Sequence, residues 1–167
     1  MKNAAMISLI FTIGLVLAIV VFMIWARSPH PIASALSHTD EEWKEMLTPE
    51  EYRITRKAGT EPPHSNDAYT YMFRTQPGTF YDVTGEQALF RTEDEFDSGT
   101  GWPSFTKPIS PDALIERTDF KLGYPRTEIL SSTYGHHLGH VFTDGPEPTG
   151  LRYCMNAAAL KFVPDEG

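Results

Sequence analysis

The 167-residue chain has little cysteine and little positive charge. Its single cysteine, Cys154, excludes an intramolecular disulfide and a zinc site built from four thiolates. There are 14 Lys and Arg residues against 22 Asp and Glu residues, which gives a formal net charge of −8. So acidic a chain lacks the basic surface that binds phosphate backbones, so nucleic acid is not expected as a partner. The chain is also too short for several large domains.

A long apolar run without charge occupies residues 4–25, between Lys2 and Arg27. As a helix its ~22 residues reach about 33 Å, enough to cross the hydrocarbon core of a bilayer. A cleaved signal peptide is the alternative, because residues 33–35 (ASA) resemble a cleavage site, but the apolar part of a signal peptide is usually shorter. The expected organisation is an N-terminal membrane anchor (1–27), a linker (28–38) and a globular domain (39–167).

The position of Lys2 before the span favours a cytoplasmic N-terminus. We therefore expect a membrane-anchored protein whose domain lies in the periplasm. A domain on the cytoplasmic face, and one secreted after cleavage, are the alternatives.

Capping and strand patterns predict a mainly β domain. Thr48-Pro49-Glu50-Glu51 is a capping box with proline at the first helical position, which predicts a helix over 49–58. The short aromatic and β-branched runs that follow are not separated by helical patterns, so we expect an antiparallel β core with one or two helices on its N-terminal side. The expected strands are residues 69–73, 79–83, 88–91, 113–117, 127–132, 137–142, 152–155 and 160–163.

The segment around Cys154 alternates polar and apolar residues. As a strand it places Arg152, Cys154 and Asn156 on one face, and Tyr153 and Met155 on the other. A guanidinium beside the thiol favours the thiolate, so we expect Arg152 to lower the pKa of Cys154. A lone cysteine is more often a small buried apolar residue, but polar neighbours on its face argue against that reading here.

Three of the six histidines lie within residues 136–140. Histidine transfers protons near neutral pH and also binds metals. In a regular strand His136 and His140 share one face, whereas a turn at Gly139 would bring His137 and His140 together. The spacing leaves catalysis, metal binding and an ordinary polar surface open.

The loop FDSGTGWPSF at residues 96–105 places a large indole, Trp102, between a glycine and a proline. Gly101 permits positive φ and Pro103 restricts the backbone. Trp102 is either an apolar wall of a small pocket or a core aromatic beside a turn.

Taken together, these segments resemble the methionine-R-sulfoxide reductases, the B class of methionine sulfoxide reductases. The resemblance covers residues 47–164 and implies a fold of two antiparallel β-sheets, often called a β-tent. It also implies reduction of the R epimer of methionine sulfoxide, in peptides or as the free amino acid. The matching segments are GTEPP at 59–63, FDSGTGWPSF at 96–105, HLGHVFTDGPEPTG at 137–150 and RYCMNAAALKF at 152–162.

The resemblance implies catalytic roles for four residues. Cys154 matches the family's nucleophile, whose attack on the sulfoxide sulfur leaves methionine and a sulfenic acid. His137 and His140 match paired histidines that position the substrate or supply a proton. Asn156 matches an active-site amide that orients a histidine or a water.

The resemblance also implies three substrate-binding residues. Trp102 matches the tryptophan whose indole holds the terminal methyl group of the substrate. Asp144 and Arg152 match further active-site positions, and Arg152 is the residue expected to stabilise the thiolate.

Two departures from the family pattern concern metal and recycling. Many members hold a structural zinc with two C-x-x-C pairs, but this chain has Asp82, Gly85, Ser131 and Tyr134 there, so no zinc or other cofactor is expected. Many members also carry a recycling cysteine where this chain has Thr100. The expected reductant is therefore external, a thioredoxin-like domain or a small thiol.

The protein is expected to be a monomer. Its expected partners are oxidised methionine in proteins or peptides, the external thioredoxin-like or small-thiol reductant, and the membrane. Two other functions remain open: a metal-dependent enzyme or sensor that uses the histidines of residues 136–140, and a tethered module that recognises oxidised methionine without turnover. His136, which precedes the histidine pair His137 and His140, is given no role in the chemistry that the resemblance implies.

Overall fold

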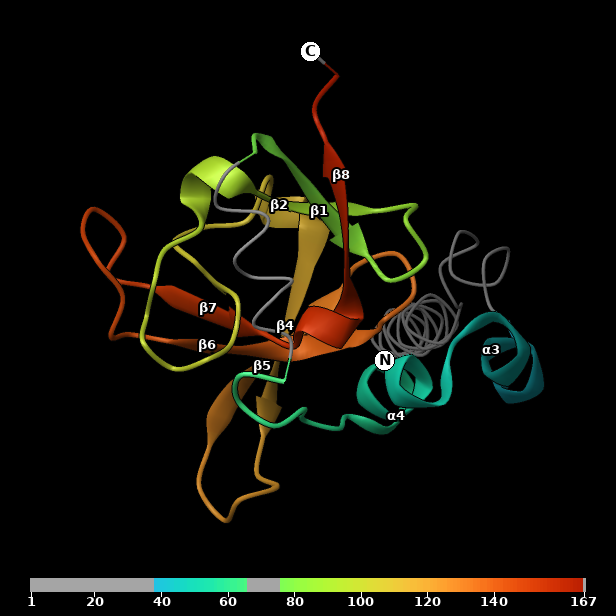
Figure 1. The fold of residues 1–167 in the computed structure, drawn as a ribbon. Coiled ribbons are helices and arrows are strands. Elements are labelled where there is room, and N and C mark those ends of the chain that lie inside the picture. Colours follow the sequence, from blue (N-terminus) through green and yellow to red (C-terminus); the bar gives the residue numbers. More distant parts are fainter. Residues whose placement is uncertain (1–37, 66–75, 167) are drawn as a thin grey trace, which may run out of the picture. The chain divides into compact units, whose positions relative to one another are not determined.

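The structure, a computed structural model, describes residues 38–65 and 76–166, and His38–Gly167 form one compact unit (Figure 1). Two antiparallel sheets make up this unit, one with the strand order β2-β1-β8 and one with the order β3-β7-β6-β5-β4. This confirms the predicted mainly β fold of two antiparallel sheets with short helices. The strands are β1 (Gly78–Asp82), β2 (Ala88–Arg91), β3 (Ser104–Phe105), β4 (Leu114–Asp119), β5 (Arg126–Ser131), β6 (His137–Phe142), β7 (Arg152–Met155) and β8 (Leu160–Pro164).

Two short helices precede the sheets. Each begins at a capping box, with Thr39 and Thr48 as the capping residues, so the first free N–H groups are satisfied locally. The second helix ends at Lys57, one residue before the predicted end, and is followed by Ala58, whose φ of 49° is left-handed. The helices are α3 (Asp40–Met46) and α4 (Pro49–Lys57), and three 3-10 turns follow: η1 (Thr92–Asp94), η2 (Pro111–Ala113) and η3 (Ala157–Ala159).

Most predicted strands occur in the structure. Strands β2, β6 and β7 have the predicted bounds, and β1, β4, β5 and β8 differ from them by one or two residues. Strand β3 was not predicted, and helix α3 agrees with the expected one or two helices although its residues were not given, because two and seven residues are too few to show a period. The predicted strand 69–73 lies outside the described residues.

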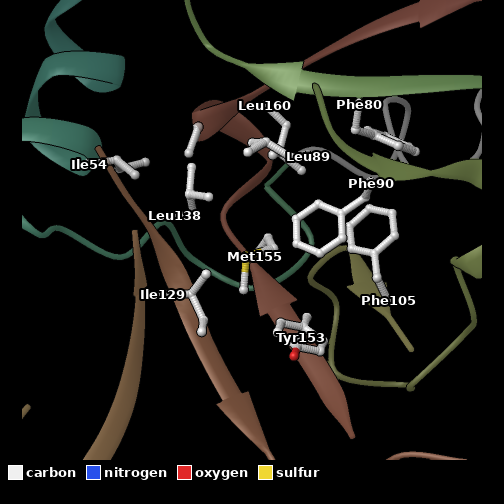
Figure 2. Close-up of a cluster of buried hydrophobic side chains, with 11 residues drawn as sticks. Ile54, Phe80, Leu89, Phe90, Phe105, Ile129, Leu138, Tyr153, Met155 and Leu160 are labelled. Atoms are coloured by element: carbon white, nitrogen blue, oxygen red, sulfur yellow. The ribbon is translucent and has the colours of Figure 1, made fainter. Parts of the chain in front are cut away.

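A cluster of buried apolar side chains fills the space between the sheets (Figure 2). Phe90 stacks on Phe105 with ring centroids 4.3 Å apart, and Phe80 meets Phe105 edge-on at 4.9 Å. Tyr153 and Met155 of β7 also lie in this cluster, which confirms that they share one face of that strand and shows that this face points inward. Burial of each such side chain contributes about 1.5–3 kcal/mol, so the core fixes β7 and the face that carries Cys154.

A buried contact between a histidine and a carboxylate connects the two sheets at another place. His136 Nδ1, just before β6, lies 3.2 Å from Asp82 Oδ2 of β1, and both side chains are inaccessible to solvent. Trp43 of α3 packs edge-on against the His136 ring at 4.6 Å. His136, which had no predicted role, therefore helps to hold the two sheets together.

The predicted membrane span over residues 4–25 lies outside the described residues. No helix within residues 38–65 and 76–166 is long and apolar enough to cross a bilayer.

Candidate active site

Cys154 lies in β7 between two polar strands. Its backbone pairs with Ser104 of β3 on one side and with His140 of β6 on the other. Directly paired residues of neighbouring strands project to the same face of a sheet, so the thiol, the hydroxyl and the imidazole share one face. The side chain is partly buried, as an accessible nucleophile in a pocket would be.

The surroundings of the thiol act on its pKa in opposite directions. Burial raises the pKa, whereas the Arg152 guanidinium, and then the nearby Thr100 and Ser104, lower it. Burial is the larger effect, so the pKa of Cys154 lies above its ordinary value. The predicted contribution of Arg152 has the right sign, but the predicted net lowering was wrong, because partial burial of the thiol outweighs one guanidinium.

A β-bulge brings two of the clustered histidines together. In the pairing of β5 with β6, Ile129 faces Gly139 but Leu130 faces His137, so one extra residue is inserted into β6. As a result the rings of His137 and His140 lie 5.5 Å apart. The regular-strand alternative, in which His136 and His140 share a face, is therefore wrong, since His136 lies outside β6.

Each of these two histidines binds its own carboxylate. His137 Nδ1 lies 2.7 Å from Glu128 Oε1, and His140 Nε2 lies 2.9 Å from Asp119 Oδ2. Burial lowers the pKa of both imidazoles, although the carboxylates act in the opposite direction. Both rings are therefore neutral at neutral pH.

The carboxylates select the tautomer of each ring. An ionised carboxylate only accepts hydrogen bonds, so His137 carries its proton on Nδ1 and His140 carries its proton on Nε2. The second nitrogen of each neutral ring is then a base. His137 Nε2 is buried without a hydrogen-bond partner among the described residues.

Two arginines hold the carboxylates ionised. Burial raises the pKa of Glu128, but Arg117 at 2.8 Å and His137 together bring it below the ordinary value. The pKa of Asp119 is lowered by the Lys121 backbone N–H and by His140, with a further contribution from Arg126. Glu128 and Asp119 were missed at the sequence level, because strand β5 (RTEILS) is largely polar and nothing in its pattern singles out the glutamate.

Glu61 connects Trp102 with Asn156. The Trp102 indole N–H donates to the Glu61 carbonyl at 3.2 Å, and the Glu61 N–H donates to Asn156 Oδ1 at 3.0 Å. The Glu61 carboxylate accepts from Ala157 N–H at 2.5 Å and from Ala158 N–H at 3.1 Å, at the start of η3. This buried glutamate was noticed only as part of the GTEPP motif, yet it determines where the indole lies.

The amide of Asn156 bonds only to backbone in these contacts. Its Nδ2 donates to the Leu138 carbonyl at 3.0 Å, and Leu138 lies between His137 and Gly139 in β6. Asn156 therefore connects the end of β7 to the bulged part of β6 that carries the histidines.

Asp144 and Arg152 form a two-point ion pair at the other end of β7. The Arg152 Nε–Asp144 Oδ1 and Nη2–Oδ2 distances are 2.9 and 2.8 Å, and the guanidinium lies 4.6 Å from the Phe142 ring centroid. The aspartate fixes the cation that acts on the Cys154 thiol.

The histidine pair borders an open cleft of about 320 Å³. Its wall also contains Asp119, Glu128 and Leu122. Within the described ranges no three His, Cys, Asp or Glu side chains are grouped so as to hold a metal ion. The site contains a thiol and neutral imidazoles, the groups that a cysteine-dependent enzyme uses for nucleophilic catalysis.

Comparison with known proteins identifies the class. The SelR domain matches residues 47–164. The peptide methionine sulfoxide reductase MsrB of Acinetobacter baylyi is 49% identical over 131 residues, which cover 78% of this chain and 92% of that protein. MsrB of Teredinibacter turnerae is 47% identical over 123 residues, 74% of this chain and 89% of its own. The chain therefore belongs to the SelR-domain family, the class B methionine sulfoxide reductases, and is an oxidoreductase of that class.

A two-part relative shows the same domain within a longer chain. The MsrA/MsrB protein of Vibrio cholerae is 44% identical over 128 residues, which cover 77% of this chain but 33% of that protein.

Proposed function

We propose that this protein reduces the R epimer of methionine sulfoxide, in peptides and as the free amino acid, with Cys154 as the nucleophile. The observation that carries the proposal is the pairing of Cys154 with His140 on neighbouring strands, with the base nitrogen of a neutral imidazole on the face of the thiol. The names of the relatives supply the substrate class.

The chemistry follows from the protonation states. Cys154 begins as a thiol, and His140 accepts its proton as the sulfur attacks the sulfoxide sulfur. The proton passes to the sulfoxide oxygen, and this oxygen is transferred to the cysteine. The products are methionine and a Cys154 sulfenic acid, so the substrate gains the two electrons that the cysteine loses.

Selectivity for one epimer requires different contacts on the two sides of the sulfoxide sulfur. The indole of Trp102, held by Glu61, is proposed to contact the terminal methyl group, and the histidine side of the site receives the oxygen. In the S epimer these two groups exchange places, which puts the oxygen against the apolar ring.

The sulfenic acid needs an external reductant, since the chain has no second cysteine. Two thiols of a thioredoxin-like domain, or two small thiols, remove the oxygen as water and leave as a disulfide. No zinc or other cofactor takes part in this proposal. The protein is proposed to act as a monomer.

The apolar run at residues 4–25 supports a further part of the proposal, a domain tethered to the membrane and facing the periplasm. The test is a reporter fused after Gly167, whose activity is expected in the periplasm and not in the cytoplasm. Activity of the reporter only inside the cytoplasm would overturn this orientation.

The test of the activity uses the full-length chain in a mild detergent, with separated R and S methionine sulfoxide peptides and excess dithiothreitol. Cys154→Ser is the matched control, because it replaces one sulfur by oxygen. Reduction of the R epimer alone, absent in the variant, is the expected result. Reduction that persists in Cys154→Ser would refute the proposed nucleophile.

A single-turnover experiment without reductant separates catalysis from mere recognition. One methionine per protein, together with loss of the free thiol, is expected. Binding of the sulfoxide with no methionine formed would support the non-catalytic alternative.

A further inference from the structure

An apolar surface lies beside the histidine cleft on the turn that joins β4 to β5. The side chains of Phe120, Leu122 and Tyr124 are 65%, 58% and 56% exposed, whereas large apolar side chains are usually buried. They alternate along residues 120–124, and Figure 1 shows this hairpin reaching beyond the body of the five-stranded sheet. We define these three side chains as the hairpin surface.

The hairpin is held in a defined conformation despite its exposure. Asp119 Oδ1 accepts from the Lys121 N–H at 2.7 Å, and the Gly123 N–H donates to the Phe120 carbonyl at 2.9 Å. Gly123 adopts a φ of +84°, which glycine permits without strain. The Lys121 ammonium donates to the Ala58 carbonyl at the end of α4, at 2.8 Å.

The hairpin surface meets the histidine cleft at Leu122. Asp119, at the base of the hairpin, binds His140, and Leu122 lines the same cleft as His137 and His140. A residue bound within this cleft therefore has chain neighbours that pass over the exposed aromatic and aliphatic side chains. Apolar patches of this kind next to a catalytic cleft are typical of binding surfaces.

We propose that the hairpin surface docks the apolar residues that flank an oxidised methionine in an extended polypeptide. This inference rests on the proposed function, whose substrate it narrows from any methionine sulfoxide to one in an apolar stretch of chain. Methionine is most often buried, so the segment that carries it usually contributes other apolar side chains to the core, and an unfolded chain exposes them as chain neighbours of the oxidised residue. The free amino acid has no such neighbours and does not reach the hairpin.

The test compares the full-length wild-type chain with the double variant Phe120→Ser/Tyr124→Ser, because these two exposed residues lie outside the lining of the histidine cleft. Three substrates are used: a peptide with leucine and phenylalanine around R-methionine sulfoxide, a peptide with glycine and serine there, and the free amino acid. We expect kcat/KM for the apolar peptide to fall about five- to tenfold, mainly through KM, and the other two values to stay within about twofold. Ile109→Ser, at a residue 42% exposed and outside this cleft, is the matched control and should leave all three values unchanged.

Binding of a fluorescent apolar-flanked peptide, measured by anisotropy, gives a readout that does not depend on turnover. If the wild-type chain reduces none of the substrates but binds this peptide more tightly than the double variant does, the proposed function fails and the docking surface stands. Equal losses for all three substrates would show that the hairpin only supports the fold, and unchanged values would show that nothing docks there.

A second copy of the chain is the other molecule that would cover the hairpin surface, and it has to be excluded. Wild type and double variant are compared by sedimentation at equal concentrations. Self-association of the wild type that is lost in the variant would assign the hairpin surface to a dimer and overturn the proposal.

Discussion

At the scale of single residues, Cys154 is subject to two opposing effects. Burial disfavours the thiolate, and the Arg152 cation, fixed by Asp144, favours it. The proposed nucleophile is therefore a thiol before the substrate arrives, and it then needs a base. This arrangement protects the cysteine from unselective oxidation, because oxidants react with the thiolate.

The first prediction concerns the titration of this thiol. Its alkylation by iodoacetamide should accelerate with pH, with an apparent pKa above the ordinary ~8.5. Because the guanidinium lowers the pKa, Arg152→Ala should raise the apparent pKa further, whereas Arg152→Lys should keep it close to the wild-type value. A wild-type pKa below ~8.5, or one that Arg152→Ala leaves unchanged, would contradict this account.

The second prediction concerns the carboxylate behind His140. Asp119→Asn removes a charge that raises the pKa of His140, so this pKa should fall and the acid limb of the kcat profile should move to lower pH. The asparagine also no longer selects one tautomer, so kcat should fall about 10- to 100-fold.

Glu128→Gln is the matched comparison for that variant, because it makes the same change behind His137. We expect it to lower kcat less, since His140 and not His137 pairs with Cys154. A larger effect of Glu128→Gln would transfer the proton-carrying role to His137.

At the scale of secondary structure elements, helix α3 contributes more than its seven residues suggest. It lies before residue 47, where the SelR domain match begins. Trp43 is 2% exposed and packs edge-on against Tyr134 and His136, with the Arg56 guanidinium 5.3 Å from its ring. The helix thus covers the turn between β5 and β6.

The third prediction is that Trp43→Ala destabilises the domain by about 3–5 kcal/mol and detaches α3. The reason is the loss of a fully buried indole whose cavity α3 alone cannot refill. Urea unfolding measures the stability, and proteolysis near residues 40–46 measures the detachment. Met46→Ala, at an exposed position of the same helix, is the control and should change neither.

Elements with a clear period or cap could be predicted from the sequence. Strands β6 and β7 and the start of α4 depend on local alternation and on a capping box, and they occur where predicted. The pairing of His137 with Glu128 could not be predicted, because it depends on which strands are neighbours and on a bulge. The predicted direction of the Cys154 pKa shift was wrong for a related reason, since burial of the thiol is a property of the folded chain.

At the scale of the whole molecule, the two sheets need connections besides their shared core. One connection joins His136 to Asp82 of β1, which stands at one of the C-x-x-C positions of the family pattern. Thr84 also donates to Asp82, and Ser131 Oγ accepts from the His136 N–H at 3.1 Å. Polar groups that bind one another thus occupy this region, and we expect chelators to leave the unfolding midpoint unchanged.

The last prediction tests that connection. Asp82→Ala should destabilise the domain by about 3–5 kcal/mol, because it leaves a buried histidine without its partner. Asp165→Ala, which breaks an exposed pair with Arg91, is the matched control and should have little effect. Replacing both Asp82 and His136 by leucine should recover part of the loss, since the buried imidazole is removed together with its partner.

The pH dependence of the unfolding free energy tests the same contact between Asp82 and His136. Burial opposes ionisation of Asp82, but the bonds from His136 and Thr84 bring its pKa below the usual ~4. The carboxylate therefore stabilises the fold above that usual value, and this contribution is lost as the pH falls through the lower, folded-state pKa. Stability measured by urea unfolding should decline less steeply below pH ~4 in Asp82→Asn than in the wild type. Parallel curves for the two proteins would mean that folding does not change the pKa of Asp82, and would contradict this account.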